Sequence, residues 1–278
     1  MSVMDPLVTL EWLAGQIGTP GLMVFDATFY LASEGRDAKA EFRAAHIPGT
    51  QFFDISVVAD PDTSLPHMVP SAGRFQTLLR MMGVSDDSRL VFYDQKGVAT
   101  SPRGWWLMGL FGHDRVAVLD GGLPGWVAAG QPTESGDAPV PAPGTFTARL
   151  RADRLRGLGD MLDGAPALIL DARSRGRFSG AEPEPRPGLP GGHMPGARNI
   201  PSSTVAAGGR MLPPANLRQI FEAAGDDGTR PVVTTCGSGI TATVLTFART
   251  VAGLPPGAVY DGSWTEWALT PGTRKEIS

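Results

Sequence analysis

The residue with the clearest chemical potential is Cys236, the only cysteine among the 278 residues. It follows an apolar run at residues 231–235 and precedes a turn that contains Gly237 and Gly239. Ligands bind at the carboxyl ends of strands in open α/β sheets, and glycines let successive amide N–H groups converge on one point. A helix that starts near Thr241 would add partial positive charge there. The pattern predicts a stabilised thiolate that is open to attack a donor.

Other readings of this cysteine are weaker. A lone cysteine is commonly a buried structural side chain, although its place between a strand and a Gly-Ser-Gly turn favours chemistry. A phosphate-binding loop would end in Lys followed by Ser or Thr, and this turn does not. A cysteine phosphatase needs an arginine to close its loop, but the position six after the cysteine is Ala242, and Arg249 lies further along.

The elements that must position Cys236 occur twice along the chain. The two copies share, in the same order, an apolar run that ends in aspartate, a His-x-Pro-Gly turn, a second apolar run and an Asp-Gly segment followed by tryptophan. The matching landmarks are Asp26 with Asp171, His46 with His193, residues 90–93 with 232–235, and Asp120 with Asp261. We therefore expect two duplicated domains, with the two His-x-Pro-Gly histidines in structural roles.

Each copy alternates short apolar runs with helical patterns, which indicates an α/β fold with two similar domains, each a mostly parallel sheet covered by helices on both faces. Strands are expected at residues 23–26, 89–93, 116–119, 167–171, 231–235 and 258–260, and helices at 74–82, 103–111, 217–224 and 240–251. A proline-rich stretch at 131–144 marks the junction. The expected parts are an N-terminal domain at 1–135, a linker at 136–148 and a C-terminal catalytic domain at 149–278. A second Pro/Gly-rich stretch at 181–196 predicts a long, functional loop.

The composition argues against a nucleic-acid-binding protein, a membrane protein and a metal-binding protein. The net charge of −4 lacks the basic excess that nucleic acids or anionic membranes require, and no apolar stretch is long enough to cross a bilayer. The N-terminus shows no secretory pattern, and a single cysteine fits a reducing compartment, so we expect a cytoplasmic protein. Four scattered histidines and one cysteine show no metal-ligand spacing. No metal or organic cofactor is expected.

These motifs resemble the rhodanese superfamily, in particular its tandem-domain 3-mercaptopyruvate sulfurtransferases. The resemblance runs over nearly the whole chain and is carried by residues 42–49, 66–70, 102–106, 171–178, 182–188, the Cys236 turn and residues 260–264. It implies that the C-terminal domain carries the catalytic cysteine and that the N-terminal domain is catalytically silent. Asp94 stands at the corresponding strand end of the first copy.

The resemblance also implies a donor and its binding residues. Thiosulfate-using relatives carry cationic residues after the cysteine, whereas this turn is neutral and is similar to the mercaptopyruvate type. Arg177 and Arg186 stand where the family binds the substrate carboxylate, which suits the fork of a guanidinium group. Ion pairs with Glu182 or Glu184 are the alternative role for these arginines.

The remaining site residues belong to the turn and to the first copy. Ser238 is expected to bond the departing substrate oxygen or to relay a proton, with the alternative that it is a small turn residue. The turn residues expected to bind substrate are Gly237, Gly239, Ile240 and Thr241, and Thr241 is also expected to cap the following helix. His67 is expected to bind substrate or to be structural, and some relatives pair a matching histidine with this serine and an acid. This chain has Ser56 at the acid's position, so the relay is incomplete unless Asp60 or Asp62 substitutes.

The resulting hypothesis is transfer of sulfur from 3-mercaptopyruvate through a Cys236 persulfide to a thiol such as thioredoxin or a small thiol, or to cyanide. Pyruvate leaves in the first step. Two alternatives stay open: a thiosulfate:cyanide sulfurtransferase on the same fold, and a non-catalytic rhodanese-like module that binds a partner or senses oxidation.

Overall fold

The computed structural model describes residues 4–164 and 167–278. The chain forms two compact units, and each is described by itself. Unit 1 holds the described residues up to Pro61 together with Val69–Arg151 and Gly208–Met211, and unit 2 holds Asp62–Met68, Ala152–Ala207 and Leu212–Ser278. The segment Asp62–Met68 comes from the first repeat, yet it packs within unit 2.

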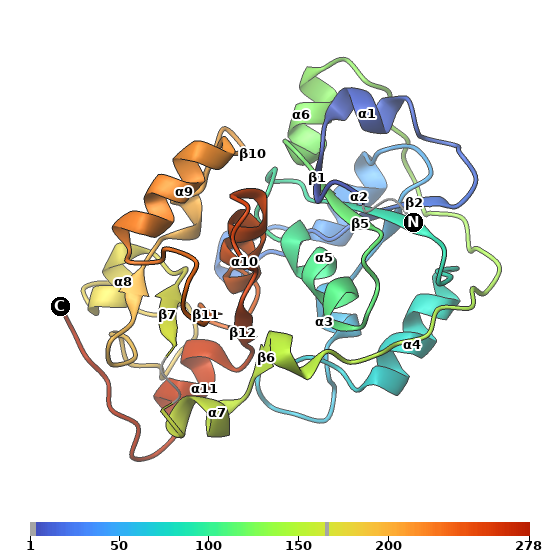
Figure 1. The fold of residues 1–278 in the computed structure, drawn as a ribbon. Coiled ribbons are helices and arrows are strands. Elements are labelled where there is room, and N and C mark those ends of the chain that lie inside the picture. Colours follow the sequence, from blue (N-terminus) through green and yellow to red (C-terminus); the bar gives the residue numbers. More distant parts are fainter. Residues whose placement is uncertain (1–3, 165–166) are drawn as a thin grey trace. The chain divides into compact units, whose positions relative to one another are not determined.

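Unit 1 is built on a five-stranded parallel sheet with the order β1-β5-β4-β2-β3 (Figure 1). Its strands are β1 (Leu7–Val8), β2 (Leu22–Asp26), β3 (Gln51–Phe52), β4 (Arg89–Tyr93) and β5 (Val116–Leu119). Its helices are α1 (Leu10–Ala14), the 3-10 helix η1 (Ala32–Glu34), α2 (Ala38–Ala44), α3 (Ile55–Val58), α4 (Ala72–Met81), α5 (Ser101–Leu110) and α6 (Gly122–Ala128).

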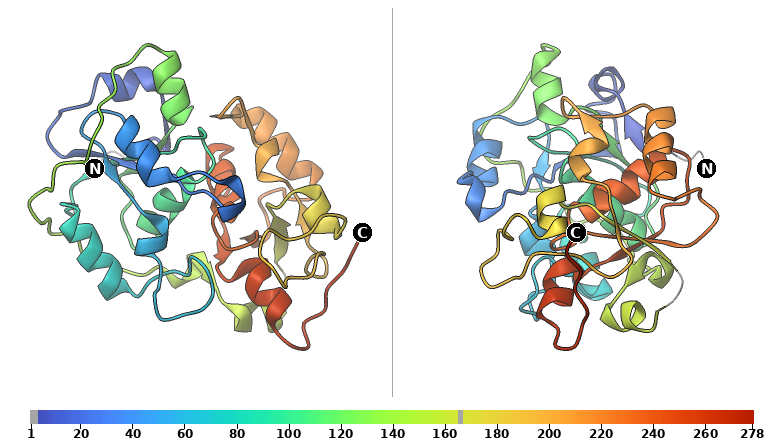
Figure 2. Two further views of the ribbon diagram at one scale, coloured as in Figure 1. Left: turned by 180° about the vertical axis from the view of Figure 1, so that it is seen from behind. Right: turned by 90° about the vertical axis from the view of Figure 1, so that its left-hand side faces the viewer.

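Unit 2, most of which is coloured yellow to red in Figure 2, repeats this topology with the order β6-β12-β11-β7-β8, again parallel throughout. Its strands are β6 (Leu155–Arg156), β7 (Leu168–Asp171), β8 (Arg198–Asn199), β11 (Val232–Thr235) and β12 (Ala258–Tyr260). A separate two-stranded ribbon joins β9 (Ala206–Ala207) and β10 (Arg210–Met211). The helices of unit 2 are η2 (Ala152–Arg154), α7 (Leu158–Leu162), α8 (Arg175–Ser179), η3 (Ser202–Thr204), α9 (Pro214–Ala223), α10 (Ala242–Val251) and α11 (Ser263–Leu269).

Both faces of each sheet are buried, as near-continuous apolar strands require. In unit 1, α1 and α6 cover one face through Leu13 and Trp126, while α5 packs on β4 and β5 from the other. In unit 2, α7 and α11 cover one face, where Trp264 and Trp267 pack near Val233. Helix α10 packs on β11 and β12 from the other face and contacts α9. The expected fold class is confirmed.

The expected strands and helices are present, with boundary shifts of at most three residues. The helix at 217–224 begins earlier, at Pro214, because proline suits the first helical turn even though it interrupts the apolar pattern. The helix at 240–251 begins later, at Ala242, because the cysteine turn runs through Thr241. Residues 181–196 hold no helix or strand, as expected for a loop.

The two His-x-Pro-Gly histidines make the same contacts in both units. His46 Nδ1 lies 2.8 Å from the Phe42 carbonyl oxygen, and its ring stacks on Phe42. His193 Nδ1 lies 2.9 Å from the Phe178 carbonyl oxygen and stacks on Phe178. Because this contact also occurs in the unit that has no cysteine, it is a structural feature of the fold.

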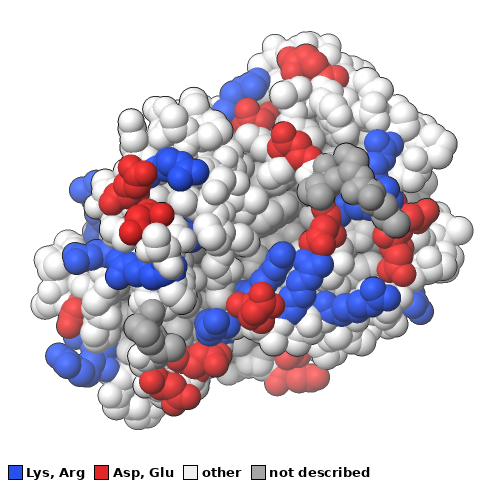
Figure 3. Space-filling model, viewed as in Figure 1, with Lys and Arg blue, Asp and Glu red and all other residues white. Residues whose placement is uncertain are grey.

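Charged side chains of both signs are interspersed on the face drawn in Figure 3, where Lys and Arg lie among Asp and Glu. Among the described residues, no helix is both long and apolar enough to cross a bilayer.

Candidate active site

Cys236 lies directly after β11 and before α10, at the carboxyl edge of the unit 2 sheet. Hydrogen bonds with the first residues of α11 hold the bend in place. The Cys236 carbonyl accepts the Trp264 amide at 2.9 Å, and the Cys236 amide donates to Ser263 Oγ at 3.2 Å. The Gly237 carbonyl accepts from the amide and the hydroxyl of Thr265 at 3.1 and 2.6 Å. The backbone of the nucleophile is therefore held rigidly before any substrate binds.

Glycine is required in this bend for two different reasons. Gly239 has φ +80°, a left-handed conformation that side chains disfavour. At Gly237, an added Cβ would lie 2.8 Å from Arg177 Nη2, so any side chain there would displace the guanidinium group. The bend and this arginine are thus closely packed.

The cysteine itself is buried, with 2% of the residue exposed. This corrects the expectation of a sulfur open to solvent. Around the cysteine, the Thr265 hydroxyl is bonded to the Gly237 carbonyl and Arg177 lies close to Gly237. The nucleophile is therefore largely shielded from solvent.

Arg186 and Arg177 both lie beside the bend, as the sequence suggested, but their environments differ. Arg186 Nη2 donates to Ser238 Oγ at 3.2 Å, and the guanidinium is half-buried. Burial lowers the pKa of Arg186, Arg177 lowers it further, and the nearby Cys236 and Glu184 act in the opposite direction. Arg186 is thus a cation close to both the sulfur and the serine.

Arg177 is already held by an acid. Its Nη2 and Nε donate to Glu184 Oε2 at 2.6 and 3.2 Å. The ion-pair role named as an alternative is therefore present, and the partner is Glu184. Glu182 instead accepts the Ser174 hydroxyl at 2.9 Å.

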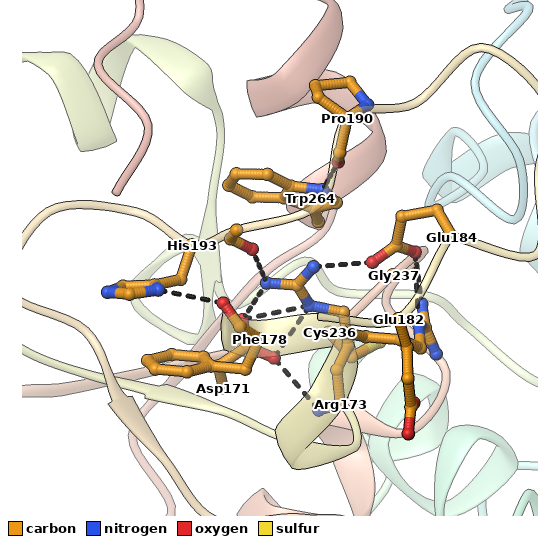
Figure 4. Close-up of polar contacts among 12 residues, drawn as sticks. Asp171, Arg173, Phe178, Glu182, Glu184, Pro190, His193, Cys236, Gly237 and Trp264 are labelled. Carbon is orange, nitrogen blue, oxygen red and sulfur yellow. Dashed lines mark hydrogen bonds and ion pairs between the residues drawn. The ribbon is translucent and has the colours of Figure 1, made fainter. Parts of the chain in front are cut away.

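A network of buried charges supports this arrangement (Figure 4). Arg173 is fully buried and forms ion pairs with Asp171 at 2.6 Å and with Glu184 at 2.7 Å. Its guanidinium also stacks over Trp264 at 4.5 Å and donates to the Gly192 carbonyl at 2.7 Å. Burial works to lower the pKa of Arg173, but the two carboxylates outweigh it and raise the pKa above its usual value. The resulting ion-pair chain runs from β7 to Arg177.

His67 reaches Ser238 within unit 2. Its Nδ1 lies 3.1 Å from Ser238 Oγ, and its backbone has φ +60°, a strained conformation for a residue with a side chain. Ser238 Oγ accepts from Arg186, so its own proton can be donated to an unprotonated His67 Nδ1. Ser56 lies on α3 of unit 1, and its amide donates to Asp54.

The corresponding bend of unit 1 shows what such a turn binds. Asp94 Oδ2 accepts the amides of Ala99, Thr100 and Ser101 at 2.8–2.9 Å and the Ser101 hydroxyl at 2.7 Å. Its Oδ1 accepts the Lys96 amide at 2.9 Å. Amides at this kind of strand-to-helix bend therefore do converge on one anion, here the protein's own carboxylate.

Several supporting residues escaped the sequence reasoning. The ion-pair network through Arg173 was not predicted, although Arg173 lies within residues 171–178, which carry the family resemblance. Ser263 and Thr265 were also missed as supports of the bend. The available signal was the recurring Asp-Gly segment: the helix that follows it bonds the strand-end residue in both units, through Trp264 to Cys236 and through Leu123 to Asp94.

The rhodanese-like domain family matches the chain twice, over residues 9–129 and 156–270. The rat 3-mercaptopyruvate sulfurtransferase is 38% identical over 273 residues, which cover 95% of this chain and 92% of that protein. The chicken thiosulfate sulfurtransferase is 37% identical over 272 residues, covering 94% and 92%. A crystal structure of SseA from Escherichia coli, described as a 3-mercaptopyruvate sulfotransferase, is similar with a TM-score of 0.85 and 33% identity, covering 94% of this chain and 99% of that one. The chain therefore belongs to the rhodanese family and carries two rhodanese-like domains in tandem.

Proposed function

We propose that the protein is a sulfurtransferase that takes sulfur from 3-mercaptopyruvate onto Cys236 and passes it to a thiol. The observation that carries the proposal is the single cysteine at a strand-to-helix bend. In the same bend, Ser238 accepts a hydrogen bond from Arg186. Relatives with high coverage are named for this activity, including the rat and human proteins. The catalytic residues are Cys236 and Ser238.

The proposed reaction has two half-reactions. The Cys236 thiolate attacks the donor sulfur, the carbon–sulfur bond breaks, and its electron pair leaves as the enolate of pyruvate, which is then protonated. The outer persulfide sulfur rests among the amides of residues 237–241. An acceptor thiolate attacks that sulfur and releases the Cys236 thiolate, so the kinetics are ping-pong.

The anion-binding capacity of the bend is supported by unit 1, where Asp94 fills the equivalent place. The same fact supports a catalytically silent unit 1, because its bend has a carboxylate in place of a thiol and is already occupied. Preorganised amides of this kind stabilise charge that develops during reaction, typically by about 3 kcal/mol for each donor.

The acceptor is proposed to be a reduced thioredoxin or a small thiol, with cyanide as a substitute. A cytoplasmic location belongs to the same proposal, because a free thiol nucleophile persists in a reducing compartment. Gly237, Gly239, Ile240 and Thr241 are proposed to contact the transferred sulfur.

Thiosulfate is the second candidate donor. Two arginines lie beside the bend, and one relative is named a thiosulfate sulfurtransferase. The test is the ratio of kcat/KM values for the two donors with one thiol acceptor. A ratio in favour of thiosulfate would overturn the proposed donor, and no turnover with either donor would leave the binding or sensing alternative.

Arg186→Gln is expected to raise KM for 3-mercaptopyruvate about tenfold to hundredfold, because a hydrogen bond to a charged group contributes about 1.5–3 kcal/mol. Arg175→Gln, an exposed position on α8, is the matched control and should leave KM unchanged. Steady-state kinetics over a range of donor concentrations measures both. Equal KM values for Arg186→Gln and the unmodified protein would remove Arg186 from the donor site.

Ser238→Ala and His67→Gln are expected to lower kcat by about a hundredfold each, the lower end of the usual range for proton-transfer groups. Because the two side chains touch, the double variant should lose much less than the product of the two losses. A double-mutant cycle on kcat tests this. Fully multiplicative losses would show that the 3.1 Å contact has no part in turnover.

A further inference from the structure

We propose that Glu184 sets the charge of the donor site and thereby selects a singly charged donor over a doubly charged one. This inference rests on the proposed function and adds a specificity-determining residue to it. Glu184 acts through Arg177, so it is a positioning residue and does not touch the donor.

Glu184 forms ion pairs with two arginines, one through each carboxylate oxygen. Its Oε1 accepts from Arg173 Nη1 at 2.7 Å, and its Oε2 accepts from Arg177 Nη2 at 2.6 Å. The Glu184 side chain is 1% exposed, whereas that of Arg177 is 21% exposed. A buried carboxylate in contact with both guanidinium groups interacts strongly with each, since water screens it little.

The loop that carries Glu184 is stiff and tied down. Pro183 and Pro185 flank it, and each proline restricts both its own φ and the residue before it. The loop is anchored further along, where Trp264 Nε1 donates to the Pro190 carbonyl at 2.9 Å. Figure 4 shows Glu184 and Arg173 joined by a polar contact, with Trp264 beside Pro190. Glu184 therefore holds a fixed position relative to the cysteine bend.

The charges of the network balance except at one residue. Asp171 and Glu184 offset Arg173 and Arg177, because the three ion pairs link these four side chains in one chain. Within the described residues Arg186 forms no ion pair, and its polar contact is the hydroxyl of Ser238. The charged groups that act on Arg186 are Cys236, Arg177 and Glu184.

One uncompensated guanidinium beside the nucleophile suits a donor with one carboxylate, such as 3-mercaptopyruvate. Thiosulfate carries a second negative charge, so it binds most tightly where a second uncompensated cation is present. Neutralising Glu184 would supply that cation, because Arg177 lies against Gly237 and would keep its charge. A unit charge at close range in a partly buried site changes binding by roughly tenfold or more.

The test is Glu184→Gln, which keeps the shape and removes the charge. The kcat/KM ratio of thiosulfate to 3-mercaptopyruvate should rise about tenfold, following from one added charge. Both donors are measured on the same preparation, so a smaller folded fraction cancels from the ratio. Glu182→Gln is the matched control, because Glu182 is exposed, lies in the same loop and accepts a hydrogen bond from Ser174. The kcat/KM ratio of the two donors should not change in this variant.

A second measurement does not depend on turnover. Competitive inhibition by sulfate should strengthen relative to inhibition by pyruvate in Glu184→Gln, and it should not do so in Glu182→Gln. An unchanged donor ratio together with unchanged relative inhibition would overturn the role of Glu184. Failure of the unmodified protein to load sulfur from either donor would instead overturn the proposed function.

Discussion

Cys236→Ser is expected to lower sulfur transfer at least about a thousandfold, because a serine hydroxyl is a poor nucleophile toward sulfur and cannot hold a persulfide. The side chain is the only thiol of the chain, so no other residue can replace it. The measurement is the steady-state rate with 3-mercaptopyruvate and a thiol acceptor.

The substitution should leave the fold intact. Serine is close to cysteine in size, and the bonds that fix the bend involve the backbone of Cys236 and the side chains of Ser263 and Thr265. Circular dichroism and the thermal midpoint therefore serve as the control. Activity within tenfold of the unmodified protein would mean that sulfur is not carried on this residue.

Arg173→Met is expected to reduce the stability of unit 2 by about 3–5 kcal/mol, since removing one partner of a buried ion pair leaves uncompensated charge. The variant would leave Asp171 and Glu184 without their shared cation, and both carboxylates are essentially inaccessible to water. Trp264 would also lose the guanidinium that stacks on it.

Cys236 reports on this change directly, because it is the only cysteine and it is buried in unit 2. Thiol labelling across a urea series gives the midpoint at which unit 2 exposes it. The midpoint should fall by roughly 1–2 M, given typical urea dependences. Arg198→Met, at an exposed position on β8, is the control and should change stability by less than about 0.5 kcal/mol. Equal midpoints for Arg173→Met and the unmodified protein would show that the buried network contributes no stability.

Much of the fold was predictable because the sequence motifs of the domain occur twice in the chain. The long strands β2, β4 and β5 carry continuous apolar runs. The corresponding strands of unit 2, β7, β11 and β12, stand in the same order relative to the repeated motifs. The edge strands β1 and β6 span two residues each and were missed, because so short a segment has no periodicity to read. Helix starts were misplaced where a proline or the cysteine turn interrupts the apolar pattern, as at Pro214 and Ala242.

The site was predictable in its residue types but not in its pairing. The position of Cys236 after a strand and the presence of Arg177 and Arg186 were visible in the sequence. That Glu184 would hold Arg177 was not, because pairing among Glu182, Glu184 and several arginines depends on loop geometry. The contact of His67 with Ser238 was foreseen only through the resemblance, since 171 positions separate the two residues.

The burial of Cys236 was not foreseen and it bears on mechanism. Cys236 is only 2% exposed as a residue, so access of the donor to its sulfur becomes part of the donor half-reaction. Arg177 and Arg186 both lie beside the bend, and the donor carboxylate is proposed to engage Arg186. Binding of the donor and exposure of the sulfur are thus linked in this proposal.

The most direct measurement is the mass of the peptide that contains Cys236 after the unmodified protein is mixed with 3-mercaptopyruvate and the excess donor is removed. We predict a gain of one sulfur atom on Cys236, formed faster than with thiosulfate and lost when a thiol acceptor is added. A peptide of unchanged mass under the same conditions, with the protein folded, would contradict a persulfide carrier at this residue.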